Sequence, residues 1–152
     1  MEKKYFEDCR VGDKVVTPGR TITETDIVLF AAFTGDWLPL HTDVEYAKKT
    51  VFGERIAHGM LVLTVGSALA LRLGAFAVLP ELTIALYEIE KVRFRAPTKI
   101  GDTLHTECEV VQMTEIDKTR GLVAIKGYIK NQRGETVVVF TMKALVGRRP
   151  VE

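Results

Sequence analysis

The sequence has few of the residues that mark secreted or metal-binding domains. It contains two cysteines, Cys9 and Cys108, with no Cys-x-x-Cys pair and no cluster of histidines beside them. Isolated thiols of this kind are typical of a reduced, cytoplasmic protein and predict neither a disulfide framework nor a metal site. Residues 1–14 also lack the apolar run of a signal peptide. We therefore expect a cytoplasmic protein that binds no metal ion.

An excess of charge of either sign is also missing. The chain has 21 basic and 20 acidic residues, for a formal net charge of +1. A general nucleic-acid-binding protein needs a strong basic excess, so that class is excluded. With 47% hydrophobic and 27% charged residues among 152, the chain is long and apolar enough to bury one core. No repeat or linker interrupts it, and we expect a single domain over residues 1–152.

One apolar run is long enough to suggest a membrane span. Between residues 59 and 80 the only charged residue is Arg72. Arg72 lies near the middle of the run, and Gly66 and Gly74 interrupt it. A buried core helix that is apolar all round explains these features better than a span. We expect a helix from Gly59 that ends at Gly74, and no membrane contact.

The second half of the chain is strand-like. Apolar and polar residues alternate over residues 83–96, 102–116, 120–131 and 135–146, with short turns between. Shorter elements precede them: strands at 14–17 and 20–22, and helices at 23–34 and 45–53. Short turns favour an antiparallel sheet, which would wrap around the long helix in an α+β fold. Its edge strand would be satisfied by pairing with a second copy, which predicts a homodimer or a higher even oligomer.

Residues 34–46, "TGDWLPLHTDVEY", combine titratable and apolar side chains. Gly35 is suited to end the preceding helix, which places Asp36 in a loop five residues before His41. Trp37 and Leu38 favour burial, so we expect the loop to pack inward and carry Asp36 and His41 into a partly apolar pocket. Burial perturbs proton affinity, as general acid–base catalysis requires. Taken singly, either residue is more often a turn residue or a structural histidine.

A second segment, "RIAHGML" at residues 55–61, leads into the long helix. The first amides of a helix lack internal partners, and Gly59 has no side chain to keep a ligand carbonyl away from them. This predicts an oxyanion hole, although Gly59 could equally serve only a tight helix entry. The chain has no serine or cysteine nucleophile motif, no glycine-rich phosphate loop and no HExxH motif. Proton transfer beside a carbonyl is the chemistry that fits.

The segment "TGDWLPLHTDVEYA" resembles the hydratase-2 motif of the MaoC-like family of hot-dog-fold enzymes. "RIAHGM" and "VRFRAPTKIGD" are similar to two further segments of that family, and the resemblance extends over about residues 7–146. It implies a single hot-dog domain, in which an antiparallel sheet wraps around the helix that begins at Gly59. It also implies at least a dimer, with a pantetheine tunnel near the subunit interface.

The resemblance further implies an activity and roles for individual residues. The reaction would be the reversible hydration of trans-2-enoyl-CoA thioesters to (R)-3-hydroxyacyl-CoA, with no cofactor beyond the coenzyme A of the substrate. Asp36 and His41 would activate water, the Gly59 amide would hold the thioester oxygen, and Thr64 would support Asp36. His58 is expected to be structural. The substrate contacts predicted from both lines of reasoning are Trp37, Leu38, Met60, Arg93 and Arg95.

Two features leave alternatives open. The family usually has asparagine where this chain has Leu38, so hydrogen bonds that orient the dyad are lost and the pocket becomes more apolar. Lys91, Arg93 and Arg95 alternate along one strand with Lys99 beyond, and could meet coenzyme A phosphates or simply form a solvated face. A hot-dog acyl-CoA thioesterase and a non-catalytic acyl-thioester binding module remain alternatives. Coenzyme A and acyl carrier protein both remain open as the carrier.

Overall fold

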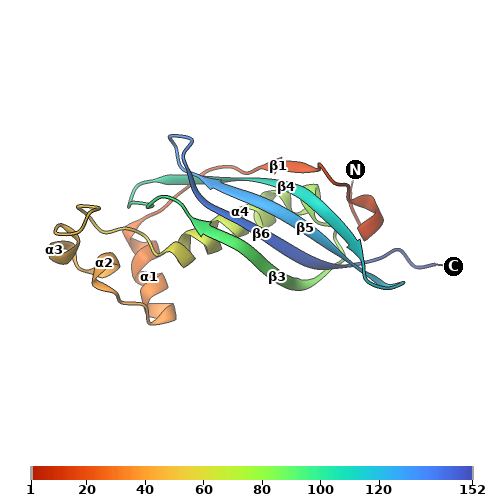
Figure 1. Cartoon of the computed structure of the whole chain (residues 1–152), viewed down its shortest axis with the longest axis horizontal. Coiled ribbons are helices and arrows are strands. Elements are labelled where there is room, and N and C mark those ends of the chain that lie inside the picture. Colours follow the sequence, from red (N-terminus) through yellow and green to blue (C-terminus); the bar gives the residue numbers. More distant parts are fainter. Residues whose placement is uncertain (1, 152) are drawn as a thin grey trace.

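The computed structural model describes residues 2–151, except for the side chains of residues 73–77. A six-stranded antiparallel sheet follows the order β1-β4-β5-β6-β3, with β2 also paired to β4. Figure 1 shows the long strands running alongside α4 (Gly59–Val78). The strands are β1 (Lys14–Val16), β2 (Arg20–Thr21), β3 (Thr83–Phe94), β4 (Thr103–Glu115), β5 (Arg120–Lys130) and β6 (Thr136–Gly147). The predicted α+β arrangement of an antiparallel sheet and one long helix is confirmed.

The helix lies very close to the sheet at Gly66. A Cβ atom at this position would stand only 2.2 Å from Cδ1 of Ile129, a fully buried residue of β5. The carbonyl of Gly66 also accepts a 2.8 Å hydrogen bond from the hydroxyl of the buried Thr106. The glycine that breaks the apolar run in the sequence is therefore required by packing, because any side chain would push α4 away from β5.

The predicted end of the long helix was wrong. α4 continues through Gly74 and ends at Val78, two residues before Pro80. A glycine inside a helix costs only about 1 kcal/mol, whereas a proline disfavours helical geometry in the residue before it. Within residues 2–151, no helix combines the length and the apolar character needed to cross a membrane.

Three short helices gather at one end of the sheet, beside the start of α4 (Figure 1). They are α1 (Glu24–Thr34), α2 (Pro39–Thr42) and α3 (Val44–Ala47). The predicted helix over 45–53 is thus shorter, because the chain enters turns after Ala47. The predicted cap of α1 is confirmed: the Thr23 hydroxyl accepts from the amide of Asp26, and the Asp26 carboxylate accepts from the amide of Thr23.

The opposite end holds η1 (Phe6–Asp8) and both ends of the chain (Figure 1). Cys9 and Cys108 are free and buried in the core there. Burial raises the pKa of both thiols to about 11. Since the thiolate is the reactive form, these cysteines are chemically inert members of the core.

Candidate active site

The loop that carries Asp36 is shaped by residues on both sides of it. α1 ends at Gly35, which adopts the left-handed conformation (φ 79°) as predicted, so Asp36 follows a helix C-terminus. Pro39 then begins α2, where its fixed φ suits the first helical turn. The carboxylate of Asp36 accepts from the amide of Leu38 at 3.3 Å. Two helix ends and a proline thus hold Asp36 and His41 at a defined separation.

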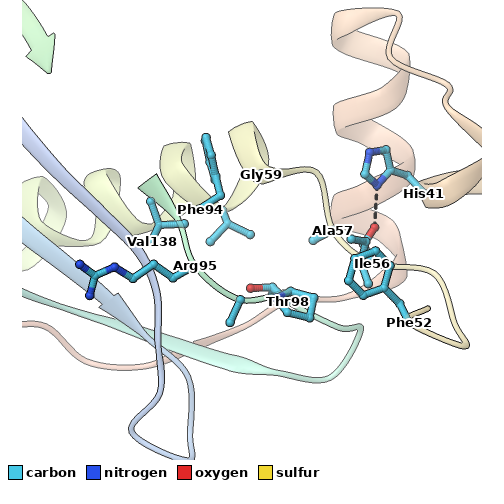
Figure 2. Close-up of a pocket in the computed structure, with 12 residues that line it drawn as sticks. His41, Phe52, Ile56, Ala57, Gly59, Phe94, Arg95, Thr98 and Val138 are labelled. Carbon is cyan, nitrogen blue, oxygen red and sulfur yellow. Dashed lines mark hydrogen bonds between the residues drawn. The ribbon is translucent and has the colours of Figure 1, made fainter. Parts of the chain in front are cut away.

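His41 is buried and oriented by a backbone carbonyl. Its Nδ1 lies 2.8 Å from the carbonyl oxygen of Ile56, shown as a dashed line in Figure 2. Because a carbonyl can only accept, Nδ1 carries the proton in the neutral ring. Nε2 then has a free lone pair, which is the arrangement that a general base needs.

His58 makes the reciprocal contact. It is 2% exposed, and its Nε2 donates to the carbonyl of Asp36 at 2.9 Å. Its ring stacks on that of His41, with centroids 3.9 Å apart and planes inclined by 29°. Burial lowers the pKa of His58, since the charged ring would lose its hydration, and the adjacent His41 acts in the same direction. His58 therefore positions both members of the predicted dyad.

These three side chains form one cluster. Asp36, His41 and His58 each offer a nitrogen or oxygen atom, and these atoms all lie within 4.8 Å of one another. One nitrogen of each ring donates to a backbone carbonyl, Nδ1 of His41 to Ile56 and Nε2 of His58 to Asp36, so each neutral ring has one nitrogen left that can accept a proton. A carboxylate beside two such imidazoles is a set of groups that can transfer protons. The cluster brings the predicted Asp36 and His41 together, with Asp36 half-buried.

A cavity of about 450 Å³ opens beside His41. Figure 2 shows Gly59 between His41 at one side and Arg95 at the other. Most of the remaining lining is apolar: Phe52, Ile56, Ala57, Val62, Phe94, Ala96, Pro97 and Val138, with the polar Thr98. Its size and character match a small-molecule site, for which about 300–1,000 Å³ is usual.

Gly59 begins α4 at this cavity. The carbonyl of His58 accepts the 3.1 Å bond from the Val62 amide, so the amide of Gly59 is among the first of the helix and has no partner within it. A Cβ atom here would lie 2.8 Å from the ring of Phe94. The missing side chain therefore lets Phe94 pack against the helix start and leaves the amide close to the cavity.

Four residues that were predicted to contact the substrate or Asp36 do not line this cavity. The expected burial of Trp37 and Leu38 was wrong: they are 53% and 59% exposed, because the turn into α2 directs His41 inward in their place. Met60 is 58% exposed on α4. The Thr64 hydroxyl donates to the Met60 carbonyl of its own helix at 2.7 Å. A contact of these four residues with substrate or with Asp36 stays a prediction.

Thr98 was missed from the sequence. It is 2% exposed and lines the cavity, and its hydroxyl has no hydrogen-bond partner among the described residues. Such a buried hydroxyl usually has a partner. The signal in the sequence is weak: Thr98 belongs to the segment "FRAPTKIGD", in which the lysine and the glycine are the more obvious candidates for a functional role.

The geometry defines a hot-dog domain with a histidine–aspartate site at the start of its central helix. A protein from Mycobacterium tuberculosis with a double hot-dog fold aligns at a TM-score of 0.84 and 22% identity, over 99% of this chain and 46% of that one. A family model described as "MaoC like domain" matches residues 7–132. The chain belongs to the MaoC-like family.

Individual relatives are consistent with this assignment. The chain is 41% identical over 102 residues to protein MaoC of Klebsiella aerogenes, and 42% identical over 100 residues to an (R)-specific enoyl-CoA hydratase of Rhodospirillum rubrum. These matches cover 67% and 66% of this chain, but only 29% and 65% of the relatives. A monoamine oxidase regulatory protein from Archaeoglobus fulgidus aligns at a TM-score of 0.93 and 43% identity, over 99% of this chain and 98% of that one.

Proposed function

We propose that this protein catalyses the reversible hydration of trans-2-enoyl-CoA thioesters to (R)-3-hydroxyacyl-CoA, with Asp36 and His41 as the catalytic dyad. The observation that carries the proposal is the orientation of His41. Its Nδ1 is bound to the Ile56 carbonyl, which leaves Nε2 to accept a proton, and His41 both belongs to the cluster with Asp36 and lines the cavity at Gly59. The hydratase among the relatives supports the same reaction class.

The cavity and the dyad allow each step of the addition. The thioester carbonyl faces the Gly59 amide at the positive end of the α4 dipole, and the β-carbon faces His41. Water held between Nε2 of His41 and the Asp36 carboxylate gives a proton to the dyad as its oxygen bonds to the β-carbon. The electron pair of the double bond forms an enolate, which the amide stabilises. The dyad returns this proton to the α-carbon, which restores the dyad and completes the addition without a cofactor, since coenzyme A is part of the substrate.

The sheet edge supports a homodimer. β3 is an edge strand, and its large apolar side chains are exposed: Ile84, Leu86, Tyr87 and Ile89 are between 42% and 59% accessible. An exposed apolar edge is normally covered or paired, and antiparallel pairing of β3 with its own copy across a two-fold axis would cover both edges at once. Light scattering of the purified protein tests this directly, and a mass of one chain would contradict it.

The first experiment follows loss of enoyl-thioester absorbance with crotonyl-CoA. Wild type should consume the substrate without releasing free thiol, and Asp36→Asn and His41→Ala should each lose at least about 100-fold in kcat while remaining folded. Glu45→Gln removes an exposed carboxylate from α3 and serves as the matched control. Near-native turnover by Asp36→Asn would exclude the mechanism, and stoichiometric thiol release would identify a thioesterase.

Leu38 motivates a panel of acyl groups. Its side chain is exposed beside the dyad in place of the family asparagine, so it can alter which chains reach the site. Straight, branched and dicarboxylic enoyl-CoAs should therefore differ in kcat/KM, and Leu38→Asn should shift the preference. Tight binding of every acyl-CoA without turnover would instead identify a binding module.

A further inference from the structure

Two buried side-chain polar atoms lack a hydrogen-bond partner among the described residues: Nδ1 of His58 and Oγ1 of Thr98. His58 already belongs to the cluster around Asp36. Thr98 does not, although its side chain lines the cavity beside His41. Roughly nine in ten buried polar groups have a partner, because burial without one forfeits the hydrogen bonds that water would make. An unpaired hydroxyl at the wall of the candidate active site therefore needs an explanation.

Two other buried threonines show the usual role of such a hydroxyl. Thr106 donates to the carbonyl of Gly66 at 2.8 Å and so links β4 to α4. Thr17 donates to the carbonyl of Pro18 at 3.0 Å. Both hydroxyls stabilise the backbone around them. The hydroxyl of Thr98 bonds to nothing in the described part of the chain, so it has no such structural role there.

The backbone at Thr98 is held from both sides. Its carbonyl accepts from the amide of Ala57 at 2.7 Å, and Lys99 pairs with Ile56 in an isolated antiparallel bridge. The amide of Lys99 donates in turn to the carboxylate of Asp102 at 2.9 Å. A binding group must be held in place before its ligand arrives, and these bonds give Thr98 that property.

The same pairing joins Thr98 to the candidate active site. Its backbone partner Ala57 comes two residues before Gly59, and the adjacent carbonyl, that of Ile56, orients His41. In Figure 2 the side chain of Thr98 lies in the part of the cavity below Gly59. A substrate in this cavity is therefore bordered by Thr98 as well as by Gly59 and His41.

Thr98 also supplies the side-chain donor that the cavity has left over. The polar side chains of its lining are those of His41, Arg95 and Thr98. The N–H of His41 is bound to the carbonyl of Ile56, and the guanidinium of Arg95 is directed away from Gly59 in Figure 2. The hydroxyl of Thr98 can turn between staggered rotamers without breaking a bond to the described chain. An oxygen atom of a bound ligand is an acceptor that it can meet.

We infer that Thr98 is a substrate-binding residue, whose hydroxyl donates a hydrogen bond to an oxygen of the bound acyl thioester. The inference takes its ligand from the proposed function. Two kinds of oxygen fit this chemistry. The thioester oxygen has two lone pairs, of which the Gly59 amide would occupy one, and a second donor would further stabilise the enolate. A hydroxyl or carboxylate on the acyl group is the other, and Thr98 would then select among acyl groups.

Thermal melts of Thr98→Val test the premise first. The substitution replaces an unpaired hydroxyl by a methyl group of similar size, so the melting temperature should rise by about 2–4 °C. Thr106→Val is the matched control: it removes the bond to Gly66, and the melting temperature should fall by a similar amount. A fall in Thr98→Val as large as that of the control would show that the hydroxyl has a partner in the free protein, and would overturn the inference.

Calorimetric titration with butyryl-CoA then measures the bond itself. This saturated thioester has the oxygen but no double bond to hydrate. Its affinity should be about 10-fold lower in Thr98→Val, and nearly unchanged in Thr98→Ser, which keeps the hydroxyl, and in Thr106→Val. S-butyl-coenzyme A, a thioether without the oxygen, should bind wild type and Thr98→Val equally. An equal loss with the thioether would overturn the inference, because no oxygen is then involved.

Succinyl-CoA separates the two kinds of oxygen, because it adds a carboxylate at the end of the acyl group. A defect of Thr98→Val with both acyl-CoAs would place the acceptor at the thioester. A defect with succinyl-CoA alone would place it on the acyl group. Equal affinities of wild type and Thr98→Val for both ligands would overturn the inference.

Hydration of crotonyl-CoA separates this inference from the proposed function. If the hydroxyl binds the thioester oxygen, Thr98→Val should lower kcat about 100-fold, because the bond strengthens as the oxygen gains negative charge. Native kcat in Thr98→Val, together with unchanged binding of both acyl-CoAs, would overturn the inference and leave the hydratase intact. Affinity for butyryl-CoA that depends on Thr98, in a protein that hydrates no enoyl thioester, would refute the hydratase and leave Thr98 as a binding residue.

Discussion

The substitution Gly59→Ala tests the role of the first amide of α4. Gly59 does not adopt the left-handed conformation, so alanine is compatible with its backbone. Its Cβ atom would nevertheless meet Cδ1 and Cε1 of Phe94 at 2.8 and 2.9 Å. Carbon atoms in contact normally stand about 3.5–4.0 Å apart, so the ring has to move by about 1 Å.

The cost should appear in catalysis and not in folding. Phe94 is 52% exposed, so its ring can swing aside without disturbing the core. The same ring lines the cavity, and the new methyl group stands beside the amide that is proposed to hold the thioester oxygen. A displacement of about 1 Å at a reacting centre can cost about 100-fold in rate. We therefore expect kcat/KM to fall about 100-fold with the melting temperature nearly unchanged.

Hydration of crotonyl-CoA, thermal melts and the double variant Gly59→Ala/Phe94→Ala complete the test. Removing the ring relieves the clash but leaves the methyl group near the amide, so the double variant should recover only part of the loss. If Gly59→Ala keeps near-native kcat/KM, the carbonyl does not approach this amide. Full recovery in the double variant would assign the whole defect to Phe94.

Three further predictions concern stability, each measured by urea denaturation. Thr23→Ala removes the cap of α1 and should lower the free energy of unfolding by about 1 kcal/mol. An unchanged free energy of unfolding would show that solvent replaces the bond to Asp26. The pKa of His58 is lowered in the folded protein, so at acidic pH the unfolded chain binds more protons than the folded one. The free energy of unfolding should therefore fall as the pH drops below 6.5, the ordinary pKa of histidine, and it should fall less steeply in His58→Asn. The same pH dependence in wild type and variant would refute this. Gly66→Ala should destabilise by about 1–3 kcal/mol through contact with Ile129, despite the better helix propensity of alanine, and unchanged stability would contradict the close approach.

Features encoded by neighbouring residues were predictable from the sequence. The Thr23–Asp26 cap and the left-handed Gly35 depend on a few adjacent positions, and both are observed. The four long strands follow from alternation between turns, and their ranges agree within a few residues. Asp36 was placed correctly after a helix C-terminus, because a glycine there is a strong local signal.

Features set by contacts between distant segments were not predictable. Trp37 and Leu38 are apolar, so their burial was expected, but they are exposed and the side chain that this loop buries is that of His41. The buried hydroxyl of Thr98 has significance only because the segment after β3 lies against residues 56 and 57. The register shifts of β3 against β6 and of β4 against β5 likewise arise from pairing between strands, which the periodicity along one strand does not reveal.

The Asp–His spacing alone does not build the site. His41 in the first segment donates to the carbonyl of Ile56 in the second, and His58 in the second donates to the carbonyl of Asp36 in the first. The two stacked rings thus join residues 36–41 to residues 56–58 by a reciprocal pair of bonds. A chain with the first motif but without the histidine before Gly59 would leave the Asp36 carbonyl without this donor. Both segments together, and neither alone, therefore define the geometry of the proposed dyad.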